Sequence, residues 1–136
     1  MRFLGSRTQA QAAAYMALAD VLFLHLKRDP NFEITIPSKT YSYLAAAKPI
    51  LAASEGELAN FITSLGAGIV CQPEDAPALA NAVKQLEAMT EAECFAMGQA
   101  GYRAVTTEYS RAALGKQYVN LFEKVFRENQ KRPKNV

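Results

Sequence analysis

The sequence contains no tryptophan, one histidine and two cysteines, and its charged residues nearly balance, with a formal net charge of +2. So small a positive excess gives no reason to expect nucleic acid as a partner. Two cysteines, Cys71 and Cys94, are too few for a disulfide scaffold. We interpret both as reduced residues of an apolar core, which predicts a cytoplasmic protein. With one histidine and two distant cysteines, we expect no metal site.

Long hydrophobic runs are also missing. No run approaches the roughly 18 apolar residues of a membrane span, and the first residues lack the apolar core of a signal peptide. The tail ENQKRPKNV is polar and basic, as expected of a solvated terminus. Half of the residues are nevertheless hydrophobic. The chain can therefore bury the core of one domain, residues 1–136.

Short apolar segments alternate with helical patterns. Thr8 with Gln11, Ser38, Asp75, and Thr90 with Glu93 are typical helix starts, and Gly66 suits a helix end. The expected strands cover residues 2–4, 20–26, 50–53 and 67–73, and the strand at 20–26 is expected to be buried on both faces. This pattern predicts an α/β, Rossmann-like three-layer domain, with an open parallel sheet of about four strands followed by C-terminal helices.

Ligands of open parallel sheets bind beyond the carboxyl ends of the strands. Three loops are expected at that edge, at residues 5–7, 27–37 and 54–57. The second loop leads into the helix that starts at Ser38, whose free N–H groups suit an anion. Lys39 lies in that first turn, where a cation is unfavourable unless a phosphate lies between. As an alternative, Lys39 is a solvated surface lysine.

Three further residues near this edge can be interpreted in two ways. His25, close to the end of a strand, could reach a ligand or be a hydrogen-bonded edge residue. Glu55 and Gly56 could take part in binding, or form the turn into the next helix, whose start favours acidic residues. We can assign no nucleophile with its base, and therefore no catalytic residue.

The order of these motifs resembles the C-terminal domain of retaining glycosyltransferases of the GT-B class, the family 4 group. Bacterial members that build cell-surface polysaccharides are the most similar. The resemblance extends from Phe3 to about Tyr118. It is carried by the succession FLG, YMALADVLFLHLK, IPSKTYSYLAAAKPILAA, GE, GAGIVCQPED, LANAVKQL and GYRAVTTEYS.

This resemblance implies a domain that binds a nucleoside-diphosphate sugar as donor, without a further cofactor. The backbone of Leu4, Gly5 and Ser6 would lie near the base. The turn of residues 37–40 would hold the diphosphate, and Ser42 would approach the ribose. The diphosphate residues are Pro37, Ser38, Lys39 and Thr40.

Two departures from the family pattern stand out. The family often carries two glutamates spaced E-x7-E, but here Ile34, with Glu33 beside it, and Ser42 hold those positions. The chain also begins at what resembles the third strand of the domain. We therefore expect the C-terminal fragment of a longer two-domain enzyme, inactive by itself, whose partner is its missing N-terminal domain. Many members act on lipid-linked acceptors, which implies at most a peripheral location at the inner face of the membrane.

A strand left without its neighbour tends to recruit another. We expect either that residues 2–5 close against the strand at residues 20–26, or that two copies pair through this edge as a homodimer. Two alternatives to the enzyme remain. One is a stand-alone flavodoxin-like binding or regulatory module, which usually has an acidic cluster that FLGSRT lacks. The other is an assembly domain that uses the apolar stripe of its last helix, Leu114 to Val125.

Overall fold

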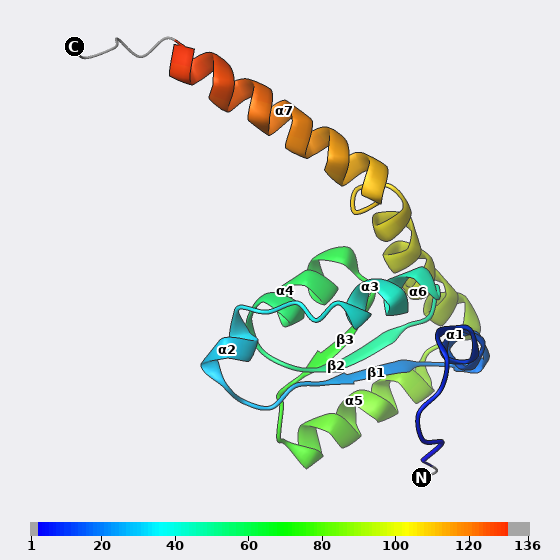
Figure 1. The fold of residues 1–136 in the computed structure, drawn as a ribbon. Coiled ribbons are helices and arrows are strands. Elements are labelled where there is room, and N and C mark those ends of the chain that lie inside the picture. Colours follow the sequence, from blue (N-terminus) through cyan, green and yellow to red (C-terminus); the bar gives the residue numbers. More distant parts are fainter. Residues whose placement is uncertain (1–2, 131–136) are drawn as a thin grey trace.

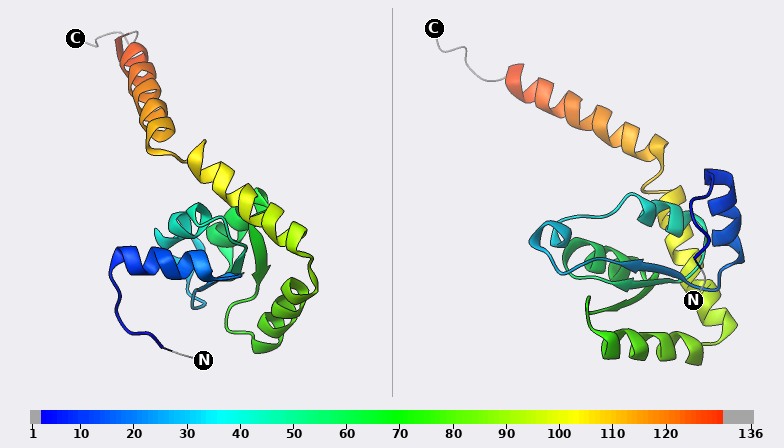
Figure 2. Two further views of the ribbon diagram at one scale, coloured as in Figure 1. Left: turned by 90° about the vertical axis from the view of Figure 1, so that its right-hand side faces the viewer. Right: turned by 60° about the horizontal axis from the view of Figure 1, so that its bottom comes forward.

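The computed structural model describes residues 3–130. They form a parallel three-stranded sheet, in the order β1-β2-β3, with helices on both faces (Figure 1). Helices α3, α4 and α6 lie on one face and α5 on the other (Figures 1 and 2). The three-layer α/β prediction is confirmed. The elements are α1 (Gln9–Leu18), β1 (Leu22–His25), α2 (Pro30–Glu33), α3 (Lys39–Ala45), β2 (Ile50–Ala53), α4 (Gly56–Leu65), β3 (Gly68–Cys71), α5 (Ala76–Ala88), α6 (Glu91–Thr106) and α7 (Arg111–Gln130).

The main core lies between the sheet and helices α3, α4 and α6. Each large aliphatic side chain that leaves water there stabilises the fold by about 1.5–3 kcal/mol. Tyr41, Phe61 and Tyr109 extend this core, with the rings of Phe61 and Tyr109 edge-to-face at 5.1 Å between centroids. A smaller core of Leu51, Ala82 and Leu86 lies beneath α5. The largest fully buried aliphatic side chains of the main core are Leu24, Leu44, Ile50, Leu58 and Ile62.

The strand prediction was wrong in two respects. Residues 3–5 form no strand, and the sheet has three strands instead of four; residues 1–2 lie outside the described range. A run this short offers few ladder hydrogen bonds against the entropy of ordering it. Strand β1, expected to be buried on both faces, buries only Leu22 and Leu24. Phe23 and His25 are exposed because α5 packs mainly against β3 and β2.

The four predicted helix starts are confirmed, and at three of them the side chain caps the helix. Thr8 and Thr90 form capping boxes, and the Asp75 side chain accepts from the Ala78 N–H at 2.8 Å. At Ser38 the predicted start of α3 is correct, but the predicted side-chain cap is not: the backbone of Ser38 is already helical and its side chain makes no capping bond. Helix α2 was not predicted, although Asp29 followed by Pro30 is a start signal: the Asp29 carboxylate accepts from the Asn31 N–H at 2.9 Å.

The capping box of α6 should make stability depend on pH. Hydrogen bonds from Thr90 lower the pKa of Glu93. A carboxyl group with a lowered folded pKa stabilises the protein above its unfolded pKa, and this stabilisation is lost as pH falls through the folded value. Glu93→Gln should therefore lower the urea midpoint at pH 7, and the difference from the parent protein should shrink towards pH 3. An equal difference at both pH values would contradict this role of the charge.

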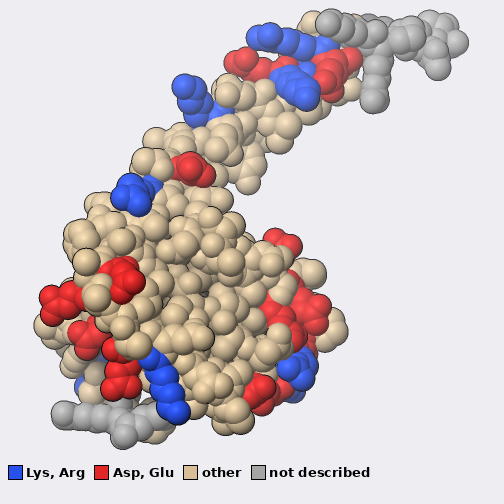
Figure 3. All heavy atoms as spheres, turned by 180° about the vertical axis from the view of Figure 1, so that it is seen from behind, with Lys and Arg blue, Asp and Glu red and all other residues tan. Residues whose placement is uncertain are grey.

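Helix α7 leaves the body of the molecule (Figures 1 and 2), and none of its residues is buried. Its exposed apolar residues include Tyr118, Phe122 and Val125. Charged side chains of both signs gather towards its far end, as Figure 3 shows. The predicted apolar stripe of the last helix is therefore present, but it does not pack against the sheet. Its surface remains available for the assembly role that the sequence analysis gave as an alternative. Across residues 3–130, every helix is too short or too polar to cross a bilayer.

Candidate functional site

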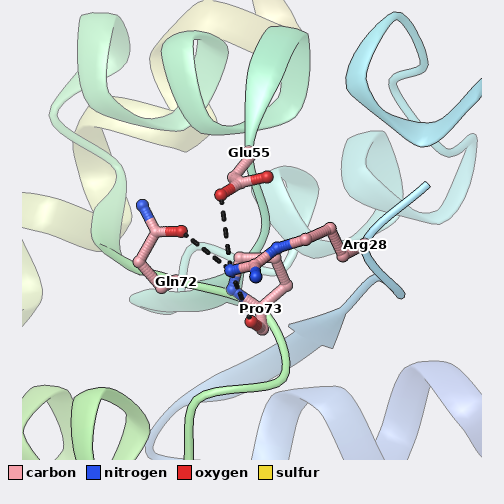
Figure 4. Close-up of polar contacts among 4 residues, drawn as sticks. All are labelled: Arg28, Glu55, Gln72 and Pro73. Atoms are coloured by element: carbon pink, nitrogen blue, oxygen red, sulfur yellow. Dashed lines mark hydrogen bonds and ion pairs between the residues drawn. The ribbon is translucent and has the colours of Figure 1, made fainter. Parts of the chain in front are cut away.

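The loops that follow β1, β2 and β3 meet at the carboxyl edge of the sheet. Arg28, from the loop after β1, lies between the other two loops (Figure 4). Its guanidinium donates to the Gln72 side chain and to the Pro73 carbonyl, both at 3.4 Å, and lies 3.7 Å from the Glu55 carboxylate. These contacts are long, and the Arg28 side chain is 56% exposed. The guanidinium is therefore held loosely and can turn towards an anion from solvent.

Gly56 joins this edge to α2. It has a positive φ of 68°, and a Cβ at this position would overlap the backbone carbonyl of Glu33. The first residue of α4 is therefore pressed against the last residue of α2. A small cavity opens here between the loops and includes Arg28, Glu33 and Glu55. Three sequence-predicted residues, Glu33, Glu55 and Gly56, thus come together around Arg28.

Two buried hydroxyl groups have no hydrogen-bond partner among the described residues. They belong to Ser54, at the end of β2, and Thr40, in the first turn of α3, which are 2% and 0% exposed. An unpaired buried hydroxyl costs about 1–3 kcal/mol. Ser54 directly precedes Glu55 and Gly56, so its hydroxyl belongs to the carboxyl edge.

The predicted diphosphate turn, residues 37–40, lies apart from the Arg28 cluster. Residues 34–38 pass from α2 over the sheet to α3, which begins nearer the middle of the sheet (Figure 1). The N–H groups of Thr40 and Tyr41 donate to the carbonyls of Pro37 and Ser38 at 2.9 and 3.3 Å. Two of the N–H groups that were expected to be free are therefore engaged. Lys39 is exposed, and Ser42 lies one turn further along α3.

The structure does not bring Leu4, Gly5 and Ser6 to this edge. All three are exposed and lead into α1, on the side where β1 begins (Figures 1 and 2). His25 lies at the end of β1, with its ring stacked on Phe23 at 6.0 Å between centroids. The prediction of one shared edge therefore holds for the loops after β1 and β2, and it was wrong for residues 5–7.

Sequence reasoning missed Arg28, Gln72 and Pro73. Arg28 lay in the loop that was singled out for its chemistry, but nothing in the pattern distinguished it from Lys27. Gln72 and Pro73 follow β3. The rule that ligands bind at the carboxyl ends of parallel strands would have pointed to the loop after β3.

A larger cavity, of about 760 Å³, lies between α5, α6 and the start of β2. Its lining is mostly apolar and includes Val21, Leu51, Leu86 and Phe95. It opens near the amino ends of the strands, away from Arg28. We place the candidate site at the carboxyl edge, because polar groups from three loops converge there and parallel sheets bind ligands there.

The cysteines and the possible metal ligands of the described residues limit the chemistry that this edge can perform. Both cysteines are unpaired and half-buried, which is less buried than the predicted core position. Burial, and then the charge of Asp75, raise the pKa of Cys71. The Cys71 thiol therefore stays protonated at neutral pH and is a poor nucleophile. Among residues 3–130, no three His, Cys, Asp or Glu side chains gather to hold a metal ion.

Known proteins resemble this chain in sequence or in fold. A probable glycosyltransferase, WbjE of Pseudomonas aeruginosa, is 34% identical over 88 residues, which cover 63% of this chain and 22% of that protein. The chain thus spans about a fifth of the length of this curated relative. A sucrose-phosphate synthase structure from Thermosynechococcus elongatus matches 93% of this chain and 30% of its own, at a TM-score of 0.72 and 24% identity. That likeness concerns the fold. The family model for glycosyl transferases group 1 matches residues 1–89, and the chain belongs to this family.

Proposed function

We propose that the chain is the donor-binding part of a glycosyltransferase that uses a nucleoside-diphosphate sugar. The enzyme would transfer the sugar to a cell-surface glycan or a lipid-linked acceptor, in the cytoplasm or at the inner face of the membrane. Its donor would be bound without a metal or a further cofactor. Family membership supports this function over a flavodoxin-like module.

The observation that carries the proposal is Arg28 at the carboxyl edge. A nucleoside diphosphate carries its charge on phosphate oxygens, which arginine binds well through its paired N–H donors. Arg28 is exposed and only loosely held by Glu55, so a phosphate can replace this carboxylate as its partner. Ser38 and Lys39, which lie apart from Arg28 at the start of α3 (Figure 1), are the alternative binding position for the diphosphate.

The remaining part of the enzyme would close the site. A donor bound at one sheet edge needs a second wall to exclude water and to position an acceptor. We propose that the N-terminal domain of a GT-B enzyme provides this wall and that the chain alone transfers no sugar. In the closed enzyme, Arg28 would stabilise the charge that develops on the leaving nucleoside diphosphate.

Titration calorimetry with UDP and GDP tests the binding half of this proposal. Arg28→Gln should weaken binding roughly 10- to 100-fold, since a hydrogen bond to a charged group contributes about 1.5–3 kcal/mol. Lys39→Ala should weaken binding less. Glu55→Gln should tighten it, because the competing carboxylate charge is removed. Lys84→Ala, an exposed lysine of α5, is the control and should bind as the parent protein does.

Equal affinities for the parent protein, Arg28→Gln and Lys39→Ala would remove both cations from the donor site. Binding that Lys39→Ala weakens and Arg28→Gln does not would move the diphosphate to the start of α3. Neither result would depend on sugar transfer, so the binding proposal can fail while the enzymatic one stands.

A further inference from the structure

The start of helix α4 lies at the carboxyl edge beside Arg28, and no side chain caps it. At the starts of α1, α5 and α6 a side-chain oxygen accepts from the first turn, but Glu55, the N-cap residue of α4, makes no such bond. The N–H groups of Gly56, Glu57 and Leu58 have no acceptor among residues 3–130. Free N–H groups at a helix start, together with the helix dipole, favour an anion.

The Glu55 carboxylate does not cap α4 because it is directed towards Arg28. Figure 4 shows the two side chains facing each other, with 3.7 Å between their charged atoms. The backbone of Glu55 begins the helix, and its carboxylate reaches the guanidinium. Arg28 and the free N–H groups of α4 therefore lie within the span of one side chain.

The hydroxyl of Ser54 is a second, independent observation at this place. It is 2% exposed and has no hydrogen-bond partner among the described residues. The ladder extends to Ser54, because its N–H donates to the Cys71 carbonyl at 3.1 Å. Side chains of a strand alternate between the two faces of the sheet. Ile50 and Ala52 face the main core, so Ser54 points to the same face, where α4 begins two residues later.

We propose that Ser54 and the start of α4 bind the second phosphate of the donor, next to the phosphate that Arg28 binds. This inference rests on the donor site proposed above. A phosphate oxygen would accept from the Ser54 hydroxyl and from the free N–H groups, and the phosphate would take the place of the Glu55 carboxylate. An exposed ion pair as long as that of Glu55 with Arg28 contributes little stability, so breaking it costs little.

The free groups at this place suit a phosphate better than a neutral sugar ring. The helix N–H groups and the guanidinium can only donate, and a phosphate oxygen accepts several such bonds at once. Glu57 lies in the same turn, but it is exposed, so water and salt screen its charge. The cavity beside Arg28 is small and is lined by Glu55. A phosphate can therefore enter only when Glu55 turns out to solvent.

Ser54→Ala tests this inference, because its effects on folding and on binding have opposite signs. Removing a buried hydroxyl that has no partner should raise the urea midpoint. UDP binding, measured by titration calorimetry, should weaken about tenfold, since a hydrogen bond to a charged group is lost. UMP has one phosphate, which Arg28 retains, so its affinity should not change. An equal loss of UMP and UDP affinity would overturn the assignment of two phosphate positions.

Ser64→Ala is the matched control in the same helix. The Ser64 hydroxyl donates to the Phe61 carbonyl at 2.9 Å, in the last turn of α4. Its loss should lower the urea midpoint slightly and leave the UDP affinity unchanged. A loss of UDP affinity in Ser64→Ala as large as that in Ser54→Ala would overturn the inference, because binding would then follow the whole helix and not its start.

Nuclear magnetic resonance of the parent chain gives a second readout that needs no variant. The amide proton resonances of Gly56 and Glu57 should shift downfield as UDP is added. Saturation with UDP while these resonances stay in place would overturn the inference. So would a Ser54→Ala variant that binds UDP as the parent does while Arg28→Gln binds it weakly. That result would leave the proposed donor site intact without α4, whereas unchanged binding by Arg28→Gln as well would remove the site itself.

Discussion

Replacing Gly56 with alanine should lower the free energy of unfolding by about 2–5 kcal/mol. A left-handed backbone costs a residue with a Cβ about 1–2 kcal/mol, and overpacking adds about 1–3 kcal/mol. The backbone of Gly56 is left-handed, and the added methyl group would overlap the carbonyl of Glu33. Glu33 and Gly56 both border the Arg28 cluster. The Gly56→Ala variant should therefore also bind UDP more weakly than the parent protein. Urea unfolding, followed through the near-ultraviolet signal of the core aromatic side chains, measures the change.

Gly66→Ala separates the two causes. Gly66 also has a left-handed backbone, with φ of 61°, but a Cβ there meets nothing within 4 Å. This variant should lose only the conformational part, about 1–2 kcal/mol. The difference between the variants is then the cost of pushing α4 away from α2. If both lost the same stability, the close approach of Gly56 to Glu33 would be unimportant.

Gly98→Leu should cost about 3 kcal/mol or more, at the upper end of what overpacking costs. Gly98 lies in α6 where this helix crosses the end of α3, and even a single Cβ would overlap the carbonyl of Ala47. That carbonyl cannot easily withdraw, because Ala47 is itself left-handed, with φ of 55°. Leucine adds three further carbons at the same point. The two helices must therefore separate, and the core around Leu44 opens.

The same substitution in α7 should have the opposite sign. Gly115 lies in an exposed helix, and nothing lies within 4 Å of the position of its Cβ. Gly115→Leu should raise helix content, because glycine is about 0.8–1 kcal/mol less favourable than alanine, and leucine ranks close to alanine. Circular dichroism and urea unfolding of both variants would check the pair. A stable, parent-like Gly98→Leu would mean that α3 and α6 do not pack as closely as described.

Local signals predicted much of this fold. Thr8, Asp75 and Thr90 form caps from residues near in sequence, so their sequence pattern fixes their structure. Ser38 carried the same signal and marks the start of α3, but it does not cap the helix. Its side chain makes no capping bond, and turn hydrogen bonds from Thr40 and Tyr41 start α3 instead. Caps are predictable where no turn hydrogen bond competes for the same N–H groups.

The candidate site was harder to predict, because its residues meet only through the sheet. Arg28 and Gln72 are 44 positions apart and come together because β1 and β3 both end at one edge. Glu55 and Gly56 were identified as candidates from their place after a strand, and Glu33 from its place beside the first glutamate position of the family pattern. Their contact with each other depends on α2, a helix of only four residues that hydrophobic periodicity cannot reveal.

Helix α7 affects how the stability of this molecule can be defined. Its 20 residues bury no side chain, so its folded form depends on intrinsic propensity, and an isolated helix of this length is marginal in water. It therefore melts in an equilibrium of its own, separate from that of the sheet and its covering helices. Heat absorption would report both equilibria, and the calorimetric enthalpy would exceed the van't Hoff value. The cooperative unit of this protein is smaller than its chain.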